Sequence, residues 1–184
     1  MRKVIAHPSP DRFISGTVGQ PGERIFFLQA KSANLVTSVV VEKSQVAILS
    51  ERIDVLLDQI IKDNNDESIA KSFSANQLDL EPLESPINEE FRVGVLSLGW
   101  NIKEKKLIIE AHADTSDKVP EIDTDSEDGP DLFRIYLSDI QGRNFAERSR
   151  RLVSAGRQPC PFCQEPLGQQ GHVCARANGY KRQL

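Results

Sequence analysis

The chain has 184 residues, of which 39% are apolar, and its formal net charge is −4. This length and composition favour one globular domain, or two small ones that share a core, and the apolar fraction is enough to build that core. No apolar run approaches the length of a membrane span, and Val4-Ile5-Ala6 is followed at once by His7-Pro8 instead of a longer apolar region. We therefore expect a cytoplasmic protein without a membrane segment or a secretory signal.

The first half of the chain predicts three strands and a helix. Residues 12–18 and 24–30 are rich in β-branched and aromatic residues, and a Gly-Gln-Pro-Gly turn between them favours a hairpin. Residues 35–42 predict a third strand. Ser44 is the expected N-cap of a helix, because apolar residues then recur at three- and four-residue steps over 46–60. A polar loop or short linker follows the helix.

The second half of the chain predicts the same order of elements. Its three strands cover residues 91–100, 106–112 and 132–137. Ser138 and Gln141 then form a capping box at the start of a helix that runs towards Gly156, where glycine is a typical terminator. The two halves, about 11–62 and 90–156, suggest an internal pseudo-repeat, although they share no obvious residue identities. Chance similarity of element order is the alternative.

These elements predict an α+β fold for a body that spans residues 1–157. We expect a mainly antiparallel sheet, or a closed β layer, with both helices covering apolar strand faces. Residues 158–184 then form a separate tail. Between two strands of the second half, residues 114–131 carry eight carboxylates and only Lys118 as counter-charge, which predicts a disordered acidic loop.

A calcium site in this acidic loop is disfavoured by its spacing. Asp123, Asp125 and Glu127 alternate as calcium ligands would. However, the glycine falls one place late, at Gly129, and Arg134 occupies the position of the bidentate glutamate.

The tail contains all three cysteines of the chain and one of its three histidines. Cys160 and Cys163 stand in a Cys-x-x-Cys turn, and His172 and Cys174 follow within eleven residues. Thiolate sulfur and imidazole nitrogen are preferred ligands of Zn²⁺, and four protein ligands are typical of a structural zinc site. Two alternatives remain open: a redox-active Cys160–Cys163 pair, and inert buried thiols.

A catalytic zinc site of the nucleobase-deaminase type is disfavoured. Such enzymes combine Pro-Cys-x-x-Cys with an upstream His-x-Glu, whereas the only upstream candidate is His112-Ala113-Asp114. The chain also lacks a phosphate-binding P-loop, a dinucleotide glycine fingerprint and a Gly-x-Ser-x-Gly elbow. His7 and His112 are interpreted as ordinary histidines, and we assign no catalytic residue.

Positive charge is concentrated near the C-terminus. Residues 141–184 carry eight basic and two acidic side chains, a balance of +6, so that residues 1–140 carry −10. This segment predicts binding to nucleic acid or to another anionic partner, although docking onto the acidic body or a solvated helix face would also explain it. The candidate anion-binding residues are Arg148, Arg151, Arg157, Arg176, Tyr180, Lys181 and Arg182.

Four stretches of the chain carry a resemblance to a known family. They are Gly-Thr-Val-Gly-Gln-Pro-Gly-Glu-Arg at residues 16–24, Phe27-Leu28-Gln29, Glu42-Lys43, and the tail from Cys160-Pro-Phe-Cys to Gly-His-Val-Cys-Ala-Arg-Ala-Asn-Gly-Tyr, which ends at residue 180. The chain resembles, over nearly its whole length, an uncharacterised bacterial domain family common in actinobacteria, whose members are sometimes described as "repeat protein". The resemblance implies a zinc-knuckle-like tail. By gene neighbourhood with a histidine-phosphatase-like and a lipid-kinase-like protein, it also implies phosphate- or nucleotide-linked metabolism.

Our leading hypothesis is a non-enzymatic cytosolic binding or adaptor protein with a structural zinc ion and a basic surface for nucleic acid or a protein partner. The rival hypothesis is an enzyme that acts on a nucleotide or a phosphorylated small molecule, with zinc purely structural. In that case Arg12, Arg24 or the Gly16–Gly22 turn would hold the anion.

Overall fold

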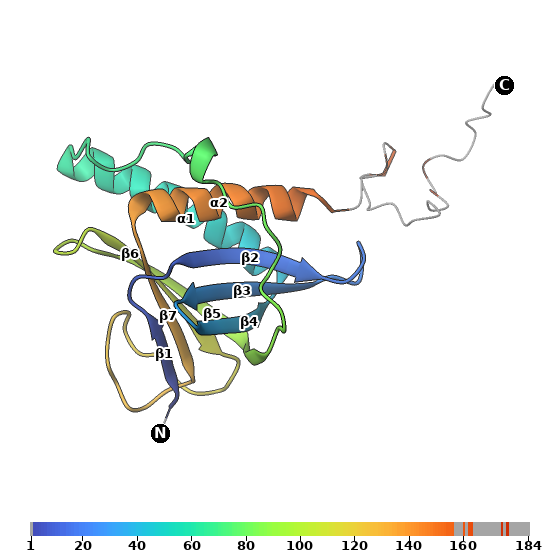
Figure 1. The fold of residues 1–184 in the computed structure, drawn as a ribbon, viewed down its shortest axis with the longest axis horizontal. Coiled ribbons are helices and arrows are strands. Elements are labelled where there is room, and N and C mark those ends of the chain that lie inside the picture. The colour runs from blue at the N-terminus through green and yellow to red at the C-terminus, as the bar shows by residue number, and fades with distance from the viewer. Residues whose placement is uncertain (1, 157–159, 161, 164–173, 175, 177–184) are drawn as a thin grey trace.

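A computed structural model of the protein describes residues 2–156 together with Cys160, Phe162, Cys163, Cys174 and Arg176. Within this part of the chain, seven strands and two α-helices form the body (Figure 1). The elements are β1 (Val4–His7), β2 (Arg12–Val18), β3 (Ile25–Ser32), β4 (Leu35–Val41), α1 (Lys43–Asn64), the 3₁₀ turn η1 (Ala75–Gln77), β5 (Glu89–Asn101), β6 (Lys106–Ala113), β7 (Leu132–Leu137) and α2 (Asp139–Ser154). The predicted α+β class is confirmed.

The strands lie in one sheet in the order β1-β7-β6-β5-β4-β3-β2. The strands β2-β3-β4 and β5-β6-β7 are two antiparallel meanders, whereas the pairs β4–β5 and β1–β7 are parallel. The sheet is therefore mixed, and the prediction of a mainly antiparallel sheet needs this correction. The physical reason is that α1 and the long segment after it carry the chain back, so that β5 starts beside β4 in the same direction.

The sheet must curl strongly, because its two edge strands are joined by only four residues, 8–11. A flat seven-stranded sheet is about 29 Å wide, while this connection reaches at most about 18 Å. The His7 side chain at the end of β1 accordingly meets the far strands. Its Nδ1 lies 2.7 Å from Ser32 Oγ, and its Nε2 lies 2.9 Å from Thr37 Oγ1.

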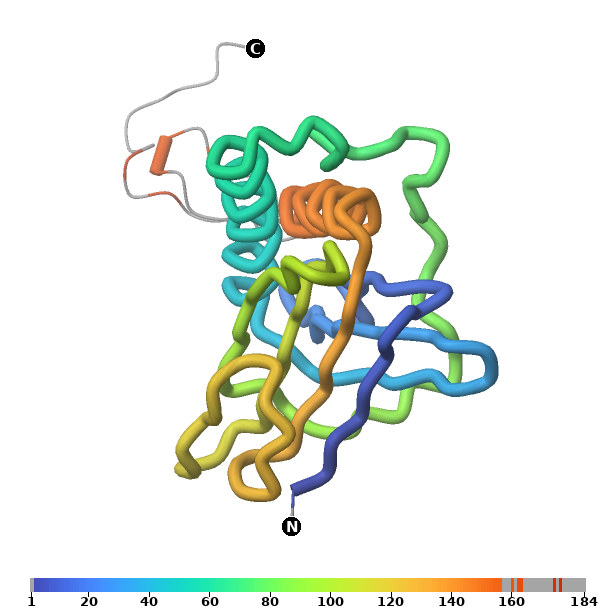
Figure 2. The backbone as a smooth tube through the Cα atoms, turned by 90° about the vertical axis from the view of Figure 1, so that its left-hand side faces the viewer, coloured from blue at the N-terminus to red at the C-terminus, as the bar shows by residue number. Residues whose placement is uncertain are grey.

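The two helices lie together on one side of the strands, as both views of the backbone show (Figure 2). α1 buries Val46, Leu49, Ile53 and Leu57 in the main core, where they join inward-facing residues of all the longer strands and Phe145 of α2. Each helix packs on the first strand of the opposite meander, α1 on β5 and α2 on β2. The two halves thus share one core, and duplication of a half stays a prediction.

The helix starts illustrate one confirmed and one wrong prediction. Ser138 and Gln141 form the predicted capping box: Gln141 N donates to Ser138 Oγ at 3.2 Å, and Ser138 N donates to Gln141 Oε1 at 2.9 Å. α1 begins at Lys43, with Glu42 as its N-cap in place of the predicted Ser44. Gln45 Oε1 accepts the Glu42 N–H at 2.8 Å, and this side chain fixes the earlier start.

The sheet face turned away from the helices is covered by two non-helical segments. The segment between α1 and β5 places Leu83 and Ile87 on Ile14, Phe27 and Val40. The acidic segment 114–131 covers β6 and β7, where Arg134 Nη1 donates to Asp125 Oδ1 at 2.8 Å and Arg134 Nη2 to Thr124 O at 2.7 Å. The acidic segment was predicted to be disordered. The structure instead shows it bound to the sheet through hydrogen bonds from the buried Arg134.

No helix in the described part of the chain has both the length and the apolar character needed to cross a membrane.

Candidate functional site

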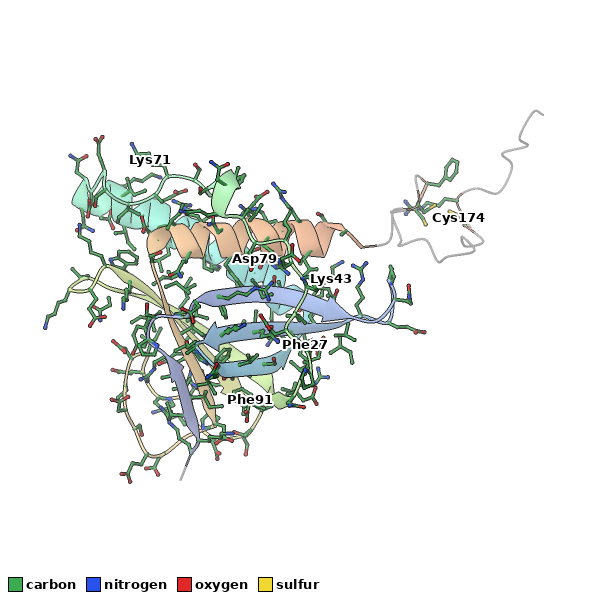
Figure 3. The ribbon with its side chains drawn as sticks, viewed as in Figure 1. Phe27, Lys43, Lys71, Asp79, Phe91 and Cys174 are labelled. Atoms are coloured by element: carbon green, nitrogen blue, oxygen red, sulfur yellow. The ribbon has the colours of Figure 1, made fainter. Side chains whose placement is uncertain are left out.

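The three cysteines of the tail come together. Cys160, Cys163 and Cys174 have their sulfur atoms within 4.8 Å of one another, and Cys160 is only 3% exposed. Figure 3 shows Cys174 beyond the C-terminal end of α2. The tight turn at Phe162 and Cys163 brings the first two sulfurs together, as the Cys-x-x-Cys spacing predicts. This cluster could bind a metal ion.

The donor set of the cluster fits a thiophilic ion. Zn–S bonds of about 2.3 Å in a tetrahedral site place two sulfurs about 3.8 Å apart, which small side-chain adjustments reach from the observed separations. Three thiolate ligands also favour zinc over a hard cation such as Mg²⁺. The predicted fourth ligand, His172, lies outside the described residues, as do Arg157, Tyr180, Lys181 and Arg182 of the predicted anion-binding set.

Arg148, the first predicted anion-binding residue, is buried inside the body. Its guanidinium donates to Ser15 O at 2.8 Å and to Glu81 O at 2.7 Å, and a third hydrogen bond goes to Asp79 O. Burial lowers the pKa of this guanidinium. The placement differs from the exposed position that the prediction requires, because Arg148 holds the α1–β5 segment against α2 and β2.

The other basic side chains of α2 also have acidic partners. Arg143 is buried and contacts Asp54 and Asp58 of α1, while Arg150 bridges Asp54 and Glu147. Arg151, a predicted anion-binding residue, donates to Glu147 Oε1 at 2.7 Å, and its guanidinium lies 5.8 Å from the centre of the Phe73 ring. Arg176 is exposed. Arg143 and Arg150 therefore join the two helices, whereas Arg148 is buried against β2 and the α1–β5 segment and Arg151 pairs within α2, so these arginines do not form an open cationic surface.

A cavity of about 480 Å³ opens where α1 begins and α2 ends. The turn after β2, the start of β3, the end of β4 and the start of β5 complete its wall. Its lining residues are Pro21, Gly22, Arg24, Ile25, Phe26, Val40, Val41, Glu42, Lys43, Arg92, Val153 and Gly156. Three basic residues thus face one acidic residue, which makes the cavity locally cationic on a body that is acidic.

The charged residues of this cavity differ in how far they are neutralised. Arg92 Nη1 contacts Glu42 Oε1 at 2.5 Å, and Arg24 Nη1 donates to Ala155 O at 3.2 Å at the end of α2. Lys43 is exposed and forms no ion pair within the described residues; Figure 3 labels it. Arg12, the other arginine considered for an anion site, is held by both carboxylate oxygens of Asp79, at 2.5 and 3.0 Å.

Sequence reasoning missed a buried polar cluster beneath the acidic segment. Glu110 and Arg134 form an ion pair, and His112 Nε2 lies 3.3 Å from Glu110 Oε2. Burial opposes ionisation of Glu110, but contacts with His112, Asp123 N and Arg134 outweigh it and lower its pKa. Burial, with the hydrogen bond to Asp123, raises the pKa of Tyr136 to about 12. Within the described chain, the cluster serves to anchor the acidic segment.

The chain matches one protein-family model over residues 6–174, the family described as "Protein of unknown function (DUF3090)". The match covers most of the chain and includes all three cysteines, so the chain belongs to the DUF3090 family. The resemblance found in the sequence is thereby confirmed. No curated protein and no solved structure gives a match.

Proposed function

We propose that this member of the DUF3090 family is a binding protein whose C-terminal tail is stabilised by a zinc ion. The observation that carries the proposal is the approach of Cys160, Cys163 and Cys174 to within 4.8 Å of one another. His172 is the proposed fourth ligand, because it stands two residues before Cys174 in the chain. Four protein ligands leave zinc no open coordination position, so the ion has a structural role.

The metal is tested by zinc analysis of the full-length protein purified without chelator. We expect about one zinc per chain, strong loss in Cys160→Ser and Cys174→Ser, and partial loss in His172→Ala. His7→Gln is the matched control, since His7 is far from the tail in the sequence and has two hydroxyl partners. Metal-free wild-type protein with a Cys160–Cys163 disulfide would support the redox alternative instead.

Cobalt substitution tests the proposed fourth ligand. A tetrahedral Co²⁺ site with thiolate ligands gives intense visible and sulfur-to-metal charge-transfer bands. We expect these bands in the wild type and a changed spectrum in His172→Ala. An identical spectrum in both proteins would remove His172 from the site and leave the three cysteines with another ligand.

The proposed binding role concerns an anionic partner. It is supported by the cationic cavity, where Lys43 stands without an ion-pair partner among the described residues. A gel-shift assay with RNA and DNA at low and raised salt tests the nucleic-acid form of the proposal, because phosphate contacts weaken steeply with salt. Absence of retardation at low salt would leave a protein-partner adaptor.

A second candidate function is an enzyme that acts on a nucleotide or a phosphorylated small molecule. The cavity favours it, because about 480 Å³ falls within the roughly 300–1,000 Å³ of small-molecule sites. Incubation of the zinc-loaded protein with nucleotides and sugar phosphates, followed by product analysis, tests this candidate. Turnover that Arg92→Ala abolishes would favour the enzyme, and binding without turnover would favour the adaptor.

A further inference from the structure

We infer that the cavity between the start of α1 and the end of α2 is a binding site for a phosphate-bearing small molecule of nucleotide size. The inference rests on the proposed function, because it names the class and the location of the anionic partner. It assigns phosphate contact to Lys43 and Arg92, with Arg24 as the third basic residue of the lining.

The wall of the cavity combines two kinds of surface. Charged groups stand at Arg24, Lys43 and Arg92, while Ile25 and the half-buried Val153 supply apolar area; Phe26 and Val41 also line the cavity but are only 7% and 3% exposed. Ile25, at the edge, is 48% exposed, which is a high fraction for an isoleucine at a strand start. A ligand with an anionic group and a flat, weakly polar body would fit both the charged and the apolar parts of this wall. A nucleoside phosphate is such a ligand.

The charges of the cavity leave a cationic excess for a ligand. Glu42 can neutralise only one of the three basic residues, and it contacts Arg92. The same contact fixes the position of the Arg92 guanidinium, whose planar group presents further N–H donors suited to phosphate oxygens. Lys43 has no competing carboxylate within the described residues, so a phosphate would be its first ionic partner.

The beginning of α1 adds to this excess. Its first helical residue is Lys43, the three residues after the N-cap carry no carboxylate, and the only acidic group at this end is the N-cap Glu42. A cation at a helix N-terminus opposes the helix dipole and usually costs stability. An anion bound at this place would interact favourably with the lysine and with the helix dipole, in addition to the Glu42 carboxylate that already caps the helix.

The surroundings of the cavity favour a small anion over an extended one. The basic side chains of α2 are paired with Asp54, Asp58 and Glu147, and residues 1–140 carry a balance of −10. A long polyanion would run over this acidic surface and be repelled, whereas a single phosphate feels mainly the local field within about 10 Å.

The inference is tested by calorimetric titration and thermal-shift measurements on the full-length, zinc-loaded protein. The probes are pyrophosphate, AMP, ATP and ribose 5-phosphate, with adenosine as the phosphate-free control. We expect AMP or ATP to bind and to raise the unfolding midpoint, with pyrophosphate weaker and adenosine without effect. Lys43→Ala and Arg92→Ala should each weaken binding about ten-fold.

Lys62→Ala is the matched control variant, because Lys62 is an exposed lysine in the last turn of the same helix. It should bind the probes as the wild type does. No binding of any phosphate probe, equal binding of adenosine and AMP, or unchanged affinity in Lys43→Ala and Arg92→Ala would each overturn the inference. RNA retardation without small-molecule binding would overturn it while leaving the proposed binding role standing, and zinc analysis reports separately on the tail.

Discussion

Arg134 Nε donates to Glu110 Oε1 at 2.6 Å across the β6–β7 pair. Both residues are buried: Arg134 is 4% exposed and Glu110 is 1% exposed. The remaining guanidinium nitrogens reach Asp125 and Thr124 of the acidic segment. This arginine therefore does two things: it compensates a buried carboxylate, and it fastens a segment whose eight carboxylates would otherwise repel one another.

Arg134→Met should destabilise the fold by about 3–5 kcal/mol, because it leaves Glu110 buried without its cation. It should also make residues 114–131 more sensitive to limited proteolysis. Urea unfolding and a proteolysis time course measure the two effects. The control is Lys71→Met, since Lys71 and Glu67 form an exposed pair and their loss should change stability little. Equal effects of the two variants would contradict the role of Arg134.

Stability should fall as the pH drops below about 6.5, in part because of His7. Burial lowers the pKa of His7 from its ordinary value of 6.5. Below that value the unfolded chain binds a proton that the folded chain does not, so stability decreases until the pH reaches the lowered pKa. Urea unfolding between pH 7.5 and 5.5 should show a shallower pH dependence in His7→Gln than in the wild type. Parallel curves would rule out this contribution.

Gly16→Ala should destabilise the protein by about 1–3 kcal/mol, because a Cβ there would lie 2.5 Å from Leu83 Cγ. Leu83→Ala should also be destabilising, since Leu83 covers the outer face of β2 and β3. The double variant should lose less stability than the sum of the two, by roughly 0.5–3 kcal/mol, because the smaller side chain makes room for the new methyl group. Strict additivity in the double-mutant cycle would contradict the contact.

Arg143→Met should cost about 1.5–3 kcal/mol, because Arg143 is buried and its charged hydrogen bonds join α2 to Asp54 and Asp58 of α1 at 2.7 and 2.6 Å. Arg151→Met is the matched control on the same helix. Arg151 is half exposed and pairs only with Glu147, four residues before it, so we expect about 0.5 kcal/mol or less. Thermal unfolding of both variants measures the difference, and a larger effect at Arg151 would contradict the role of Arg143 between the helices.

The elements that local sequence determines were predicted well. The capping box at Ser138 and the three strands of each meander depend on residues close together in the chain, and the structure places them within one or two residues. The β2–β3 turn was readable for the same reason: Gly19 and Gly22 adopt φ values of +101° and +103°, which other residues rarely reach.

Features that depend on distant partners were missed. β1 has only four residues, and its place is set by a parallel pairing with β7 at the other end of the body. The acidic segment was expected to be disordered because its composition is visible in the sequence, whereas the buried Arg134 that holds it is not recognisable as buried. The same limit explains Arg148, whose carbonyl partners come from Ser15, Asp79 and Glu81.

The two candidate sites also differ in whether local sequence predicts them. The spacing of the cysteines predicted the cluster, because its described members lie in one short stretch. The cavity draws its cations from the β2–β3 turn, α1 and β5, which no local motif connects.

The pairing of β1 with β7 has a consequence for how this protein is made. The N-terminal strand leaves the ribosome first, yet its hydrogen-bonding partner is among the last strands to be synthesised. β1 can join the sheet only after that delay, and contacts between such distant parts of a chain form slowly. A nascent chain stalled before Leu132 would expose both sheet edges, and we expect it to depend on chaperones more than the finished protein does.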